Sequence, residues 1–318
     1  MNERIRYVMT FLQPNADRIP KLPHYKVLPW IFGASVLMIC VFAASAYALV
    51  WYHRFYHHIT PQELSHEVKH SSYQVYLHGG LPVTLHQYQQ ENALHQKLVL
   101  FTSGDGGWSP FCADIAAHIA ASGMTVVGID AKDYLVHVAS SQKPISAEEL
   151  TLDYDAIAKL SVAKPGVDSS ANLILAGWSL GAGYSVLVAS QPEFSNRVDR
   201  VVAISPPIYN ELAWKPTDAL IYLTHGTPRE KVFDARQYVK KLGGTPMFIL
   251  NATDDDTSPL KDAQLIFEAS PDSKRLFTVK ARGHHFEGGE TEFYRDLDQG
   301  LSFRNDENFG QSGSLAKK

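Results

Sequence analysis

Short apolar runs of strand length alternate with helix-length patterns from about residue 72 to residue 301. The pair SYQVYLH and LPVTLHQY predicts an opening hairpin, and Ser146 with Glu149 forms a capping box at the start of one helix. The later strand-like runs are KLVLF, MTVVGID, NLILAG, RVVAIS, PMFILN and RLFTVKA. Alternating strands and helices form a mostly parallel sheet with helices on both faces. The fold class is therefore α/β, and ligand sites are expected at the carboxyl ends of the strands.

An uncharged segment precedes this region. From Val27 to His53 there is no Asp, Glu, Lys or Arg, and about 20 apolar residues suffice to cross a hydrocarbon core of roughly 30 Å. Before it, five Lys and Arg residues outnumber two acidic ones, so the positive-inside rule keeps the N-terminus in the cytoplasm. We expect an uncleaved signal anchor. Cleavage after Ala44-Ser45-Ala46 is the alternative, although the leader is long for a signal peptide.

The chain is therefore divided into five parts by the sequence. They are a cytoplasmic N-terminal segment (1–26), a transmembrane helix (27–52), a juxtamembrane stalk (53–71), one α/β domain (72–305) and a flexible C-terminal tail (306–318). The 29 basic and 33 acidic residues give a net charge of -4, which argues against a nucleic-acid partner. No Cys/His run has zinc spacing, and the histidines of the stalk lack a carboxylate partner. We expect no metal and no cofactor.

Ser179 stands at the centre of the pattern G-x-S-x-G. The run NLILA leads directly into Gly177-Trp178-Ser179-Leu180-Gly181, and the following residues have a helical pattern. In this context a sharp turn lifts the serine hydroxyl above the sheet, and the glycines let strand and helix approach closely. Ser179 is the expected nucleophile, and the Leu180 amide is expected in an oxyanion hole.

A histidine and an acid follow Ser179 in the order that such a fold requires. RLFTVKA leads into Arg282-Gly283-His284-His285-Phe286, where the glycine before it favours His284 as the base, with His285 as the alternate. Asp254, Asp255 and Asp256 follow PMFILN; spacing to Pro259 selects Asp255, with its two neighbours as alternates. A rival acid loop after LIYLTHGTPREKV has Arg229 where the acid would stand.

A glycine-rich loop, Ser103-Gly104-Asp105-Gly106-Gly107-Trp108, follows the strand KLVLF. Its backbone amides can turn toward an oxyanion, and those of Asp105 or Gly106 are the candidates. The loop lacks the Lys-Ser/Thr ending of a P-loop and the spacing of a dinucleotide fingerprint. Trp108 and Trp178 are expected to line the substrate site, and a role in the core is the alternative for both.

The strings SGDGGW, VVGID, GWSLGA and RGHHFEGG make the sequence similar to the bacterial virulence protein family VirJ/AcvB, within the α/β-hydrolase superfamily, over roughly residues 95–300. The resemblance implies an α/β-hydrolase fold and supports Ser179, His284 or His285, and the 103–108 loop as site residues. It also implies an exported, membrane-associated domain in the periplasm, hydrolysis of aminoacylated (lysyl) phosphatidylglycerol, and a link to type IV secretion partners. The chain departs from the family in having Ala252 where a glycine is usual, and one hydrolase domain where longer relatives have two.

The expected activity is hydrolysis of a carboxylic ester by Ser179, His284 and an aspartate. A lysyl ester carries a cation, and Glu287, close to the histidines, is a candidate for an acidic pocket wall. The alternatives are another esterase, thioesterase or peptidase of the cell envelope, and a non-catalytic hydrolase-fold protein that aids secretion.

Overall fold

The computed structural model describes two compact units, Met1–His53 and Arg54–Lys318. The described residues are 35–45, 48, 68–78, 80, 82–90, 95–139, 143–164, 167–194, 196–213 and 232–302. The expected N-terminal segment 1–26, most of the stalk, the loop of Arg229 and the tail 306–318 lie outside these ranges, as do His53, His57 and His58.

In the first unit, residues 35–45 are helical, and every one of them is exposed. The exposed side chains include six large apolar ones: Val36, Leu37, Met38, Ile39, Val41 and Phe42. Within the described part of the chain, no helix combines the length and the apolar character needed to cross a membrane. The expected span 27–52 extends beyond the described residues on both sides, so its full extent stays a prediction.

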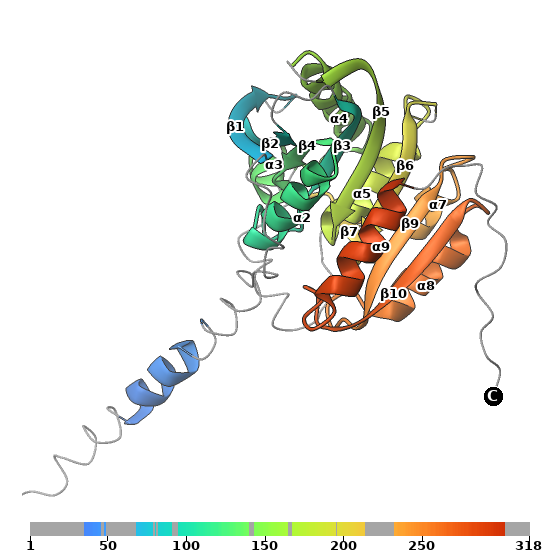
Figure 1. Ribbon diagram of the computed structural model, residues 1–318. Coiled ribbons are helices and arrows are strands. Elements are labelled where there is room, and N and C mark those ends of the chain that lie inside the picture. The colour runs from blue at the N-terminus through green and yellow to red at the C-terminus, as the bar shows by residue number, and fades with distance from the viewer. Residues whose placement is uncertain are drawn as a thin grey trace, which may run out of the picture. The chain divides into compact units, whose positions relative to one another are not determined.

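The second unit is built on an eight-stranded sheet in the order β1-β2-β4-β3-β5-β6-β9-β10 (Figure 1). Strands β4 to β10 of that order run parallel, while β1 pairs with β2, and β2 with β4, in antiparallel fashion. The strands are β1 (Val68–Tyr76), β2 (Pro82–Gln90), β3 (His95–Thr102), β4 (Thr125–Ile129), β5 (Val167–Trp178), β6 (Val198–Ile204), β9 (Met247–Asp254) and β10 (Lys274–Arg282). The predicted hairpin and the mostly parallel sheet are confirmed.

Helices cover both faces of the sheet. One apolar core includes side chains of α2 (Pro110–Ala121) and α9 (Glu290–Ser302). The other includes side chains of α3 (Ala131–Val138), α4 (Ala147–Val162), α5 (Leu180–Ala189), α7 (Ala235–Val239) and α8 (Leu260–Ala269). A separate two-stranded ribbon, β7 (Tyr209–Glu211) with β8 (Val232–Asp234), follows β6 in the chain.

The alternation of side chains along β3 explains the two cores. Leu98 and Leu100 pack in the core with α3, α4 and α5, whereas Val99 and Phe101 pack in the core with α2 and α9. Successive side chains of a strand point to opposite faces, so a continuous apolar run is what a strand buried on both faces requires. The predicted capping box is also present, since Ser146 and Glu149 bond to each other's backbone amides at the start of α4.

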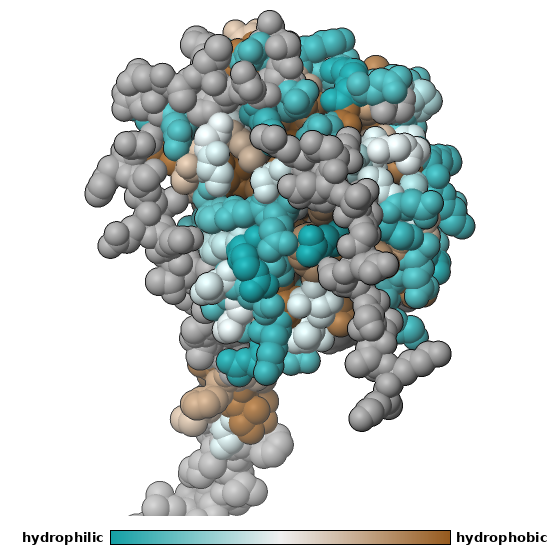
Figure 2. Space-filling view, turned by 45° about the vertical axis from the view of Figure 1, so that its right-hand side comes forward, coloured by the Kyte–Doolittle hydropathy of each residue, from teal (hydrophilic) through white to brown (hydrophobic). Residues whose placement is uncertain are grey.

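The outer surface of this unit differs from its cores. The face seen in Figure 2 is mostly hydrophilic, with apolar side chains visible only in small separate areas.

Candidate active site

The expected site residues follow the carboxyl ends of parallel strands. Strand β3 ends at Thr102, β5 at Trp178, β9 at Asp254 and β10 at Arg282. Because these strands run parallel within the order β3-β5-β6-β9-β10, their carboxyl ends lie along one edge of the sheet. The glycine-rich loop, the serine, the aspartates and the histidines are therefore brought to that edge.

Ser179 lies in a strained turn between β5 and α5. Its φ of 55° and ψ of -122° are unusual for a residue other than glycine, and its amide donates to the Ile204 carbonyl at 2.8 Å. A Cβ on Gly177 would lie 2.2 Å from the Gly181 backbone, and one on Gly181 would lie 2.1 Å from the Thr102 oxygen. The two glycines thus let β5, α5 and β3 meet at distances that no other residue allows.

The glycine-rich loop lies beside this turn. An added Cβ on Gly104 would be 3.3 Å from the Ser179 Cβ. Gly107 donates its amide to the Gly104 carbonyl at 3.0 Å, which closes the turn of this loop. Leu180 is the first residue of α5, where amides have no carbonyl of the preceding turn to bond.

Asp130 anchors the glycine-rich loop, which the sequence analysis did not foresee. Its Oδ2 accepts from the Trp108 amide at 2.9 Å, and its Oδ1 accepts from the Asp133 amide at 2.8 Å as the N-cap of α3. One carboxylate therefore holds both the loop after β3 and the helix after β4. The only sequence signal was an aspartate directly before a helical pattern, which indicates a cap but not the second bond.

His284 is paired with Asp255. The imidazole Nδ1 lies 2.8 Å from Asp255 Oδ2, and both side chains are buried, with 7% and 0% of their areas exposed. The other carboxylate oxygen, Oδ1, accepts from the amides of Thr257 and Ser258 at 2.9 and 2.8 Å. The Nε2 of His284 is buried and forms no hydrogen bond with any residue that the structure describes. The imidazole is thus held at one nitrogen and available at the other.

The charge state of Asp255 follows from these contacts. Burial by itself raises the pKa of the Asp255 carboxyl, but the positive charge of His284 and hydrogen bonds from His284 and from two backbone amides outweigh it. The net effect lowers the pKa below its ordinary value. Asp255 is therefore ionised at neutral pH, as a partner that orients a histidine must be.

The alternate residues lie in different surroundings. Asp254 and Asp256 are exposed. The ring of His285, with only 2% of the residue exposed, packs against Phe111 and Trp178, at centroid distances of 5.1 and 5.0 Å. The structure thus brings together Asp255 and His284, and it places His285 in the aromatic core behind them.

The two tryptophans expected to line the site are placed differently. Trp178 is 3% exposed, its ring lies 4.9 Å from that of His284, and its Nε1 donates to the His284 carbonyl at 3.2 Å. It supports the histidine from within the core. Trp108 stacks on His86 at 4.7 Å and covers Gly128 of β4. Its ring contacts therefore lie toward β2 and β4.

Glu287 lies against the histidine loop. A Cβ on Gly283 would be 2.5 Å from its Oε2, and this oxygen is buried without a hydrogen bond to a described residue. This oxygen therefore lies against Gly283, the residue that precedes His284.

Other reactive groups are absent or inert in the described region. Among the described residues, no three His, Cys, Asp or Glu side chains converge as a metal site would require. Burial raises the pKa of the Cys112 thiol to about 12, so this cysteine is a small buried apolar residue and not a nucleophile.

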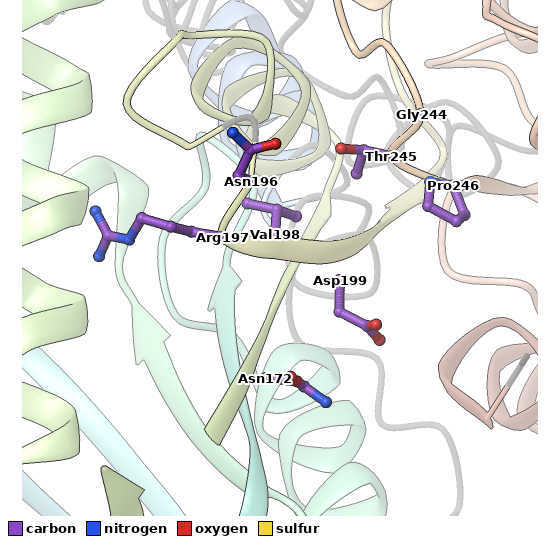
Figure 3. A pocket seen from close by; sticks show the side chains of 8 residues that line it. All are labelled: Asn172, Asn196, Arg197, Val198, Asp199, Gly244, Thr245 and Pro246. Carbon is purple, nitrogen blue, oxygen red and sulfur yellow. The ribbon is translucent and has the colours of Figure 1, made fainter. Parts of the chain in front are cut away.

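A polar hollow of about 390 Å³ lies at the other end of the strands (Figure 3). Its lining comes from β5, from the start of β6 with the two residues before it, and from the segment that precedes β9: Asn172, Asn196, Arg197, Val198, Asp199, Gly244, Thr245 and Pro246. The Arg197 side chain extends away from the hollow in Figure 3 and is paired with Asp155 at 2.6 Å. Because it lies at the amino ends of the strands, the hollow is separate from the edge that carries Ser179.

Comparisons with known proteins bear on the family and the fold. Residues 96–204 match the family described as bacterial virulence protein (VirJ), which confirms the predicted resemblance. No curated protein matches the sequence.

Solved structures show the fold. A putative dienelactone hydrolase from Klebsiella pneumoniae is similar at a TM-score of 0.54 and 13% identity, over 74% of this chain and 99% of that one. A dienelactone hydrolase from Anabaena variabilis gives 0.54 and 16%, over 74% and 98%. The esterase domain of a Rhodothermus marinus protein gives 0.51 and 14%, over 73% and 97%. The Arg54–Lys318 unit therefore has the α/β-hydrolase fold.

Proposed function

We propose that the chain is a serine hydrolase that cleaves carboxylic esters, in line with the match of residues 96–204 to the bacterial virulence protein (VirJ) family. One observation carries the proposal: His284 bonds to the buried Asp255 through Nδ1 at 2.8 Å, and its buried Nε2 has no hydrogen-bond partner among the described residues. This is the form that a general base needs. The esterases and dienelactone hydrolases that share the fold add support.

The proposed reaction has two halves. Ser179 Oγ attacks the ester carbonyl while His284 Nε2 takes its proton, and the resulting imidazolium is stabilised by Asp255. His284 then gives that proton to the leaving alcohol, which leaves an acyl group on Ser179. Water, deprotonated by His284, attacks this acyl group and releases the carboxylic acid and the free serine.

The developing oxyanion needs donors that are already in place. The Leu180 amide, at the first position of α5, is one proposed donor. The other comes from the turn of the glycine-rich loop, by way of the Asp105 or Gly106 amide, beside Ser179. Asp130 accepts a hydrogen bond from the Trp108 amide at 2.9 Å and so fixes the position of this loop and of the donor amide in it.

The test uses the full-length chain and a short aryl ester, p-nitrophenyl acetate. We expect the wild type to hydrolyse this ester and Ser179→Ala to lose essentially all of that activity. The control is Ser122→Ala, the same change at an exposed serine after α2, which should keep wild-type activity. Hydrolysis that survives in Ser179→Ala would reject the mechanism. A wild type that hydrolyses no ester of any length would favour the non-catalytic alternative.

The location of the enzyme is part of the proposal. The uncharged segment from Val27 to His53 contains a helix, 35–45, whose apolar side chains are exposed all round. A helix apolar on every side needs an apolar environment. We therefore propose a single inner-membrane anchor with the hydrolase unit in the periplasm.

The proposed substrate is an aminoacylated phospholipid, lysyl phosphatidylglycerol in particular, as the family resemblance implies. An enzyme tethered to the outer leaflet has lipid esters within reach, and Glu287, three residues after His284 in the sequence, is the proposed partner of the lysyl ammonium group. We expect Glu287→Gln to lower kcat/KM for lysyl phosphatidylglycerol in vesicles by roughly tenfold, with the aryl ester unaffected. Aryl-ester activity without release of lysine from the lipid would reject this substrate but not the chemistry.

A further inference from the structure

A buried asparagine lies at the base of the acid loop. Asn251, in β9, has no exposed surface. Its Nδ2 donates to two backbone carbonyls, those of Ala252 at 3.2 Å and Ser258 at 3.1 Å. The side chain therefore bridges the two ends of the loop that contains Asp255.

This bridge reaches the carboxylate in one further step. Ser258, whose carbonyl accepts from Asn251, donates its own amide to Asp255 Oδ1 at 2.8 Å. The orientation of that amide decides where Oδ1 lies and, with it, where Oδ2 meets His284. The geometry points to Asn251 as a positioning residue that holds Asp255 in place for His284, an assignment that rests on the proposed function.

The polarity of this part of the core supports the assignment. Asn251 Oδ1, Ser205 Oγ and Ser258 Oγ are all buried and form no hydrogen bond with any residue that the structure describes. A buried polar atom without a partner costs free energy, so an apolar side chain of similar size would make a more stable core. What the amide provides in return is the pair of hydrogen bonds that it donates to the Ala252 and Ser258 carbonyls.

The same strand ends connect the acid to the nucleophile. The Ser179 amide donates to Ile204, and the Ser205 amide donates to Leu250 at 2.8 Å, one residue before Asn251. Ser205 follows Ile204 directly, is fully buried and has a strained backbone with a φ of 46°. Asn251 therefore positions the loop of Asp255 relative to the same strand ends that position Ser179.

The experiment is a double-mutant cycle on kcat with p-nitrophenyl acetate, using the full-length wild type, Asn251→Ala, Asp255→Asn and the double variant. We expect Asn251→Ala to lower kcat roughly 10- to 100-fold with KM nearly unchanged. In the Asp255→Asn background, the same change should have no further effect, because a positioning residue acts only through the group that it positions. An equal loss in both backgrounds, or no loss in the wild type, would overturn the inference.

Two further variants keep the test decisive. Thr253→Val removes a neighbouring hydrogen bond, from an exposed side chain to the Ala281 carbonyl at 3.1 Å, without touching the acid loop, and should keep wild-type kcat. Where Asn251→Ala does not fold, Asn251→Leu, which preserves size and removes the donor without adding a charge, takes its place under the same criteria. If Asp255→Asn and Ser179→Ala are inactive while the Asn251 variants are normal, the inference fails and the proposed function stands.

Discussion

Three consecutive aspartates lie at the carboxyl end of β9, the first of them within the strand, and their surroundings differ. The side chain of Asp255 is fully buried and accepts hydrogen bonds at both oxygens, whereas Asp254 and Asp256 are exposed. A carboxylate removed from water is stable only with such partners. The structure therefore distinguishes the three by burial and bonding, which the sequence alone could rank only by spacing to Pro259.

The three aspartates should differ in the same way in catalysis. Asp255→Asn keeps the shape of the side chain but loses the charge and favours the wrong imidazole tautomer, so kcat should fall roughly 10³- to 10⁴-fold. Asp254→Asn and Asp256→Asn should stay within about threefold of wild type. Aryl-ester kinetics on the three variants measure this. Equal losses at Asp254 or Asp256 would identify a different acid.

Asp255 should also make stability depend on pH. Its pKa is lowered in the folded chain, so the unfolded chain binds more protons there, and the stabilisation is complete above the unfolded value of about 3.9. It is lost as the pH falls through the lower, folded pKa. Urea unfolding of wild type and Asp255→Asn should show a difference that is constant near neutrality and shrinks below about pH 4. A difference that grows in acid would mean that the pKa is raised instead.

Among the elements, the strands, helices and serine turn could be predicted because their signals are local. Apolar runs, a capping box and two glycines around Ser179 fix β5, α4 and the turn from neighbouring residues alone. The contacts that orient the site residues join segments that are distant in the sequence. Asp130 joins the loop after β3 to α3, and Asn251 bridges both ends of the acid loop. Neither contact has a sequence pattern, since each depends on chain segments that meet only in the folded protein.

The serine turn should tolerate no side chain at its glycines. A Cβ on Gly177 or Gly181 would lie about 2 Å from backbone atoms of α5 or β3, which cannot move aside as a flexible side chain could. Gly177→Ala and Gly181→Ala should each lower the free energy of unfolding by roughly 2 to 4 kcal/mol. Gly244→Ala, where no atom lies within 4 Å, is the control. Thermal melts in which all three behave alike would contradict this packing.

For the whole molecule, the proposed account joins an apolar anchor to a hydrolase unit with a hydrophilic surface. If it is right, the full-length chain should stay in the membrane fraction through a carbonate wash, and protease added to spheroplasts should digest the Arg54–Lys318 unit. A chain without residues 1–53 that carries a cleavable export signal should appear in the soluble periplasm. Release of the full-length chain by carbonate, or protection of its hydrolase unit in spheroplasts, would contradict the proposed anchor and orientation.

The central claim is that Ser179 is the nucleophile. A fluorophosphonate reacts with an activated serine and remains attached, so peptide mass spectrometry of the labelled full-length chain identifies the residue directly. We expect one adduct, on the peptide that contains Ser179, with loss of aryl-ester hydrolysis in proportion to labelling and no adduct in Ser179→Ala. An adduct on another residue, or hydrolysis that continues with Ser179 fully labelled, would contradict it.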